Sequence, residues 1–424
     1  MDLDALARAY VLLGLRSDRL VPGLVDAHTG AVSLRRQVAG EPRPKVDELL
    51  REAARLRTEL PSAEPSADLS AEPSAELPSA ELVPGRRDFL DRQLTALDCS
   101  LRRAAGRAPG FRAELRAYFD TDVELGEPDS YRAAHAELAT LLPGGGPLAA
   151  RMAAYRKAEE LPVEWLGPAI RALSGALREV TRSQLELPAE ETVTYEISSD
   201  RPWSAFNHYL GGHHSRVVIN SETGRRASQL PHLLAHEAYP GHHTERCRRH
   251  TVLVQRGGCV EHSLFLLNSP QCLLSEGLAD LGLTAAIGPA WGRWAAEVLA
   301  ESGVRLDGEL AERVERASAA LLAVRQDAAL MIYERHADLD EVVDYLSRWL
   351  LVPESRARQM LRFLTHPLWR GYTTTYVEGV RLLGAWLDAR PAGQSALLRL
   401  CRLHDEPLTP RALRADLGWP EPVG

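Results

Sequence analysis

The sequence predicts a mainly α-helical protein that carries a small β-sheet beside a metal-binding helix. Three observations lead to this fold class. Apolar residues recur at spacings of three and four along most of the chain, which is the helical period. Only two short segments are rich in the β-branched residues that favour strands. Histidine and acidic residues gather between residues 236 and 280, so we expect the chemistry of the protein to lie there.

The helical prediction depends on the spacing of leucines and on capping residues. Leu90, Leu94, Leu97 and Leu101 fall on one face of a helix over residues 88–103. The same period appears in residues 164–185, 313–333 and 339–351. Two further helix starts are expected where Ser or Thr precedes Pro, at Ser269–Pro270 and Thr409–Pro410.

The predicted strands are residues 191–197 (ETVTYEI) and 216–220 (RVVIN). Gly211 and Gly212 lie between them and favour a turn. These segments predict a sheet of two or three strands just before the segment that carries the candidate metal ligands.

Three regions are expected along the 424 residues: an N-terminal helical segment (1–60), a flexible insert (61–85) and one two-lobed helical catalytic body (86–424). The insert is a degenerate Pro-Ser-Ala-Glu repeat, and its prolines and few apolar residues disfavour helix, strand and a packed core.

Composition excludes several classes of protein and partner. The chain has 50 Lys and Arg against 58 Asp and Glu, so its net charge of −8 argues against a nucleic-acid partner. No apolar stretch is long enough to cross a membrane. The five cysteines form no C-x-x-C pair, which favours reduced thiols and a cytoplasmic location.

The informative motif is HEAYPGHH, which begins at His236. Zinc hydrolases commonly place histidines at i and i+4 of a helix, but here Pro240 occupies i+4. On a regular helix i+6 points about 240° from i, and i+7 lies about 10 Å further along. Pro240 and Gly241 would allow two residues to loop out, which brings His242 into the i+4 role, although His243 stays open as the second histidine.

The helix that begins at Ser269 supplies a third candidate ligand, Glu276. Asp280 lies one turn further on the same face, where it can orient a ligating histidine. Glu237 is adjacent to His236 and diverges from it, so it suits the general base for a metal-activated water.

At these residues the chain resembles the bacterial domain-of-unknown-function 885 family, which is similar to gluzincin-type metallopeptidases. The HE-x-x-PGHH stretch, SEGLAD at 275–280 and TTTYVEG at 373–379 carry the resemblance. It implies a large helical metallopeptidase-like fold with zinc on His236, His242 and Glu276, and His243 as their companion. It also aligns Tyr376 with the tyrosine of the third motif. The chain departs from the family pattern at Leu278, Tyr372 and Thr375.

Together these observations predict a zinc-dependent hydrolase that cleaves an amide or peptide bond in a short peptide or peptide-like small molecule. Tyr376 is expected to donate a hydrogen bond to the oxyanion, and Arg370 and Tyr372 to contact the substrate. The departures from the family keep two alternatives open. One is a metal-dependent lyase, isomerase or redox enzyme acting on a specialised metabolite, which bound manganese or iron in place of zinc would favour. The other is an inactive metal-binding protein.

Overall fold

The computed structural model describes residues 2–61, 83–200, 203–223 and 225–422. Residues 62–82 of the predicted insert lie outside the described residues. The rest is mainly helical with two small sheets, which confirms the predicted fold class. No helix in the described ranges is long and apolar enough to cross a membrane.

The helices fall into an N-terminal, a middle and a C-terminal group. The first group is α1 (Leu3–Asp18), α2 (Val32–Gly40), α3 (Val46–Thr58), α4 (Arg86–Ala104), α5 (Phe111–Phe119), α6 (Pro128–Leu141), α7 (Leu148–Ala158) and α8 (Val163–Gln184). The middle group is α9 (Leu230–Glu237), α10 (His242–Arg249), α11 (Pro270–Ile287), α12 (Trp291–Glu301) and α13 (Gly308–Ser318). The last group is α14 (Val324–Tyr333), α15 (Leu339–Leu350), α16 (Glu354–Thr365), α17 (Thr373–Asp388), α18 (Ala396–Asp405) and α19 (Pro410–Asp416).

Most sequence-predicted helices are confirmed. Helices α4, α8 and α15 match the expected segments to within two residues at each end. Ser269 and Thr409 cap α11 and α19 through their hydroxyl groups, which accept hydrogen bonds from backbone amides three residues on. The continuous helix predicted over 313–333 is wrong, because a 3-10 turn at Ala319–Ala323 separates α13 from α14.

The predicted sheet has three strands, β2 (Thr192–Ser198), β3 (Ala205–Gly211) and β4 (His214–Asn220). The central strand β4 pairs in parallel with β2 and antiparallel with β3. A second sheet pairs β1 (Val25–His28) with β5 (Leu264–Leu266). The sequence does not predict it, because a short apolar run cannot be distinguished from a buried helical segment when its partner lies far away in the chain.

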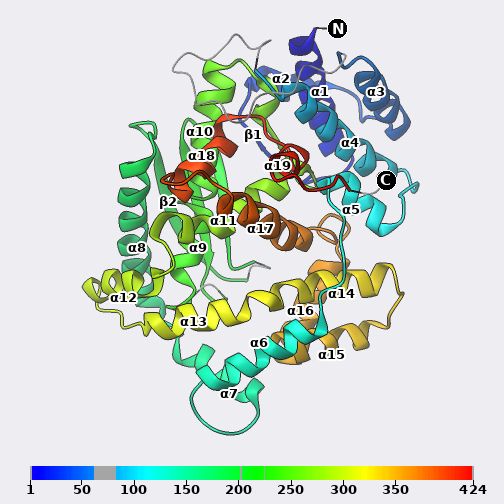
Figure 1. The fold of residues 1–424 in the computed structure, drawn as a ribbon. Helices are drawn as coiled ribbons and strands as arrows, with labels where there is room; N and C mark the ends of the chain where they lie inside the picture. Colours follow the sequence, from blue (N-terminus) through cyan, green and yellow to red (C-terminus); the bar gives the residue numbers. More distant parts are fainter. Residues whose placement is uncertain (1, 62–82, 201–202, 224, 423–424) are drawn as a thin grey trace.

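Helix α11 is at the centre of the molecule and contributes to three apolar cores. In the first core, Leu273 of α11 packs among α5, α6 and α14–α17. In the second, Cys272 packs with α1, α3 and α4. In the third, Leu283 packs with α8, α9 and the three-stranded sheet. Figure 1 shows α1–α4 gathered at one end of the molecule, and α6, α7 and α13–α16 at the other. This position brings α11 against both the metal-motif helices and α17.

The contact between α11 and α17 depends on two glycines. A Cβ atom at Gly277 would lie 2.5 Å from the carbonyl carbon of Gly379, and one at Gly379 would lie 2.6 Å from the carbonyl oxygen of Leu273. Only glycine therefore lets the two backbones approach this closely. The approach brings the first turn of α17 beside Glu276 on α11.

Candidate metal centre

The HEAYPGHH segment folds as two short helices joined by a tight connection. Helix α9 ends at Glu237 and α10 begins at His242. The amide of Gly241 donates to the carbonyl of Ala235 at 2.8 Å, which spans six residues instead of the four of a helical turn. The predicted loop-out of two residues is thus confirmed, although it separates two helices and does not bulge from a continuous one.

Gly241 is required at this connection for steric reasons. A Cβ atom there would lie 2.0 Å from the carbonyl oxygen of His236 and 2.5 Å from that of Ala235. Real Cβ atoms do not approach backbone this closely, so any side chain would push the two helices apart. The glycine therefore lets the end of α9 and the start of α10 lie together.

His236, His242 and Glu276 come together at this point from α9, α10 and α11. Their ligand atoms all lie within 4.8 Å of one another. The Nε2 atom of His236 is 3.4 Å from Oε2 of Glu276, and Nε2 of His242 is 3.4 Å from Oε1 of the same carboxylate. We call these three side chains the His-His-Glu group.

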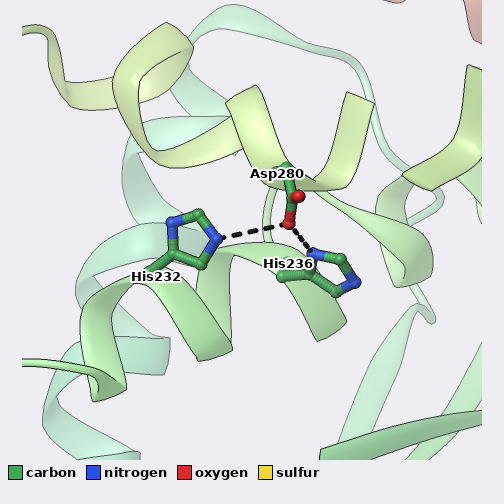
Figure 2. Close-up of side chains that lie close together, drawn as sticks. All are labelled: His232, His236 and Asp280. Carbon is green, nitrogen blue, oxygen red and sulfur yellow. Dashed lines mark hydrogen bonds and ion pairs between the residues drawn. The ribbon is translucent and has the colours of Figure 1, made fainter. Parts of the chain in front are cut away.

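Asp280 holds His236 from the side away from Glu276. Its Oδ1 atom is 2.8 Å from Nδ1 of His236 and 3.3 Å from Nε2 of His232, which lies one turn earlier on α9 (Figure 2). An Nδ1–H that donates to Asp280 leaves Nε2 of His236 as a free lone pair toward Glu276. This is the orienting contact predicted for Asp280.

The second histidine is oriented in the same way. Ser275 places its hydroxyl 3.3 Å from Nδ1 of His242 and donates a hydrogen bond to the Glu245 carboxylate. Glu245 also lies 3.9 Å from Nδ1 of His242. Both histidines of the group thus have their Nδ1 atoms occupied by polar groups of the chain and their Nε2 atoms directed at Glu276.

The electrostatics of the group fit a bound cation. Burial lowers the pKa of His242, but the Glu276 and Glu245 carboxylates together outweigh burial and raise that pKa to about 9. His236 is likewise held well above its ordinary pKa, against burial, by Asp280 and Glu276. Burial raises the pKa of Glu276, yet His242 and His236 outweigh it and hold it well below the usual range. The carboxylates around His236 and His242 therefore stabilise a positive charge between these two histidines and Glu276.

The donor set also fits a metal ion. The Oε2 atom of Glu276 is buried and accepts no hydrogen bond from any described residue. Two imidazole nitrogens and one carboxylate are ligands that zinc commonly takes when a fourth position stays open. A buried carboxylate oxygen without a donor costs free energy unless a cation compensates it. The His-His-Glu group therefore qualifies as a metal-binding group on geometry and on chemistry.

Glu237 and Tyr376 border the group. Burial raises the pKa of Glu237, while the neighbouring His236 and His242 lower it. The Tyr376 ring lies 6.3 Å from the His236 ring, centroid to centroid, and burial together with Glu276 holds the pKa of its hydroxyl well above the ordinary value. Tyr376 therefore stays protonated and can donate a hydrogen bond.

The remaining predicted site residues fall in different places. Tyr372 donates a hydrogen bond to Oε1 of Glu276 at 2.8 Å, so it contacts the group directly. Arg370 forms an ion pair with the buried Glu114, and its guanidinium lies over the Tyr333 ring at 4.6 Å. These contacts direct Arg370 toward α5 and α14, and its role in substrate binding stays a prediction.

His243 points away from the His-His-Glu group. Its Nε2 atom is 3.0 Å from Glu191 and its Nδ1 atom is 2.8 Å from the Ser215 hydroxyl. Glu191 also accepts a hydrogen bond from the Tyr239 hydroxyl and pairs with Arg178 and Arg182. Of the two candidate histidines, His242 faces Glu276, while His243 attaches α10 to the sheet.

Several residues of this centre were not predicted from the sequence. The four-residue spacing of His232 and His236 on one helix, and the three-residue spacing of His242 and Glu245, are signals that could have identified two of them. Ser275 and Glu191 carry no such signal, because their contacts join segments that are far apart in the chain.

Comparisons with known proteins reveal only distant structural likeness. No family model matches the chain, and no curated protein matches it by sequence. A candidate lipoprotein from Colwellia psychrerythraea has 14% identity and a TM-score of 0.48 over 91% of this chain and 69% of that one. A candidate lipoprotein of unknown function from Shewanella oneidensis has 12% identity and a TM-score of 0.47 over 91% and 76%. An M32 carboxypeptidase from Deinococcus radiodurans R1 has 14% identity and a TM-score of 0.40 over 99% and 95%.

Proposed function

We propose that this protein is a zinc-dependent hydrolase that cleaves an amide or peptide bond in a short peptide or peptide-like small molecule. One observation carries the proposal: the Nε2 atoms of His236 and His242 face opposite oxygens of the buried Glu276 carboxylate. These three residues would hold the zinc ion. When bound, such an ion supplies Lewis acidity toward a carbonyl and lowers the pKa of water toward 7.

The other residues of the centre have separate roles in this proposal. Glu237 is the general base, and burial, which raises the pKa of its carboxyl group, makes it a better proton acceptor. Asp280 keeps His236 in the tautomer that leaves Nε2 free. Tyr376 keeps its proton and donates a hydrogen bond to the oxygen that gains negative charge.

The test combines metal analysis with one substitution. The purified protein should contain about one zinc per chain, lose hydrolysis of a short-peptide library on chelation, and regain it when zinc is added. Glu237→Gln should keep the zinc content and lose turnover by at least about a hundredfold. Full activity after complete metal removal would contradict zinc dependence, and an active Glu237→Gln variant would contradict the base assignment.

A cytoplasmic location is part of this proposal. It is supported by the five cysteines, which are buried and free, an arrangement that suits a reducing compartment. Cell fractionation of the native host, with detection by an antibody against the protein, tests the location. Recovery in the membrane or extracellular fraction would contradict it.

A further inference from the structure

Four partly buried arginines stand out because none forms an ion pair with a carboxylate in the described part of the chain. They are Arg156 on α7, Arg226 before α9, Arg325 on α14 and Arg356 on α16. Other arginines on the same elements behave differently, since Arg358 on α16 pairs with both Glu354 and Asp340. Four unpaired guanidinium groups in partly buried positions are costly unless something anionic compensates them.

The fold brings these four residues together from distant parts of the sequence. Arg156 donates hydrogen bonds to the carbonyls of Leu350 and Leu351 at 3.1 and 2.6 Å, just before α16 begins. Arg226 pairs through its backbone with Glu160, one helical turn after Arg156. Helix α14, which carries Arg325, packs against both α15 and α16.

The guanidinium groups interact electrostatically with one another, and those of Arg156, Arg226 and Arg356 are held by neutral hydrogen-bond acceptors. Burial, followed by Arg226, Arg356 and Arg325, lowers the pKa of Arg156 to about 10. Arg226 donates twice to the side-chain oxygen of Gln229, at 3.2 and 3.0 Å, and Arg356 donates to the side chain of Gln359. Neutral partners orient these cations without removing their charge, which is the arrangement that favours an anionic ligand.

Nearby carboxylates do not neutralise the cluster. Glu160 lies within electrostatic range of Arg226, but its carboxylate pairs with Lys157 and Arg225. Glu159 also lies within electrostatic range of Arg226, but one carboxylate cannot balance four guanidinium groups. The net charge at this place is therefore positive, although the chain as a whole carries −8.

Arg325 connects the cluster to the metal centre, because its helix α14 packs against α17, the helix that carries Tyr376. It interacts electrostatically with Tyr376 and Asp280, which border the His-His-Glu group. Building on the proposed hydrolase function, we propose that Arg156, Arg226, Arg325 and Arg356 form an anion-binding site that takes a carboxylate or phosphate group of the substrate. Guanidinium groups bind both anions through paired hydrogen bonds, and a short peptide always carries a carboxylate at its C-terminus unless that end is blocked.

Equilibrium binding measured without turnover tests this site. Inorganic phosphate, N-acetyl-dialanine and its C-terminal amide are titrated by calorimetry into the zinc-loaded protein and into the metal-free protein. The metal-free titration excludes binding of the anion to zinc itself. The variants are Arg226→Gln, Arg325→Gln and Arg356→Gln. The matched control is Arg358→Gln, which removes an ion-paired, half-exposed arginine from α16, the helix that also carries Arg356.

We expect the free acid to bind at least about tenfold more tightly than the amide, and each cluster variant to remove most of this difference. The Arg358→Gln control should bind like the wild type. Arginine-dependent binding of phosphate, with equal binding of acid and amide, would support the anion site and assign it to a phosphate-bearing ligand.

Two outcomes would overturn the anion site: neither anion binds to wild-type protein, or binding is unchanged in all three cluster variants. The melting temperature of each variant serves as a check on folding. It should not fall for Arg356→Gln, because that change relieves repulsion between like charges. Absence of peptide hydrolysis would contradict the proposed function alone, since anion binding is measured independently of turnover.

Discussion

At the level of single residues, the candidate metal centre places two histidines where buried carboxylates favour their charged forms. Glu276 lies 3.4 Å from both Nε2 atoms, and Asp280 holds Nδ1 of His236. In the metal-free protein the positive charge comes from protons on the imidazoles. A zinc ion would replace those protons, because only the neutral imidazole binds a metal.

The first prediction concerns the pH dependence of the metal-free protein. The folded-state pKa of His242 is raised to about 9, above the value of the unfolded chain. Its contribution to the free energy of unfolding is therefore fully present below about pH 6.5 and is lost as pH rises to about 9. Thermal melts of metal-free protein should show stability falling over this interval, and zinc-loaded protein should not show this fall.

Zinc affinity should change in the opposite direction over the same interval. Protons compete with the metal for His242 and His236, so the affinity should increase as pH rises toward 9. Competition with a chelating indicator at a series of pH values measures this. An affinity that is constant from pH 6 to pH 9 would contradict the assignment of these histidines as ligands.

The second prediction separates the two adjacent histidines. His242→Ala removes a group that faces Glu276, and we expect zinc affinity to fall by at least about a hundredfold. His243→Ala removes contacts with Glu191 and Ser215 and should leave zinc affinity within several-fold of wild type. It should instead lower the free energy of unfolding by about 1–3 kcal/mol. Chelator competition measures the zinc affinity of both variants, and denaturant melts measure their stability. Loss of zinc affinity in His243→Ala but not in His242→Ala would show that His243 is the ligand.

At the level of elements, the connection between α9 and α10 is held at both ends. Gly241 permits the close approach of the two helices, and Glu191 binds both Tyr239 within the connection and His243 at the start of α10. The buried Glu191 also pairs with Arg178 and Arg182 of α8, so its charge is compensated. This network attaches the ligand-bearing segment to α8 and to the sheet, and it explains why His242 can face Glu276 without an i, i+4 spacing.

The third prediction tests the crossing of α11 and α17. Gly379→Ala places a Cβ atom 2.6 Å from the carbonyl oxygen of Leu273, so the helices must separate. We expect a loss of about 1–3 kcal/mol in the free energy of unfolding. Activity should also fall, because Tyr372 and Tyr376 on this side would move away from Glu276. The matched control is Gly384→Ala on the same helix, where a Cβ atom meets nothing within 4 Å. The control should be neutral or slightly stabilising, and equal melting temperatures for both variants would contradict the argument.

At the level of the whole molecule, three apolar cores meet at α11, and the metal centre lies beside this helix. Burial of apolar side chains does not depend on an ion. The helical framework should therefore persist without zinc, unlike small domains that fold only when metal is bound.

The fourth prediction follows from this independence. Removal of zinc should leave the far-ultraviolet circular dichroism spectrum unchanged while the melting temperature falls. Free zinc at a hundred times its dissociation constant should stabilise the protein by about 2.7 kcal/mol. Loss of helical signal on chelation would show that the ion is needed for folding, in contradiction to this account.

Local sequence features were sufficient to predict a large part of the structure. Leucine spacing identified α4, α8 and α15, and capping pairs identified the starts of α11 and α19. Pro240 in the place of a histidine predicted that two residues loop out, and the structure shows this as a break after Glu237. These predictions succeed because helix period, capping and proline geometry act over a few neighbouring residues.

The sequence by itself thus determined the helical class, the break in the metal-motif helix and the residue types that could bind a metal. Only the tertiary structure decided that His242 faces Glu276, that His232 supports Asp280, and that Arg156, Arg226, Arg325 and Arg356 come together without carboxylate ion pairs in the described part of the chain. The physical reason is that these contacts join elements far apart in the chain. Their geometry depends on how α9, α10, α11, α14 and α17 pack against one another. Short-range sequence patterns do not specify that packing.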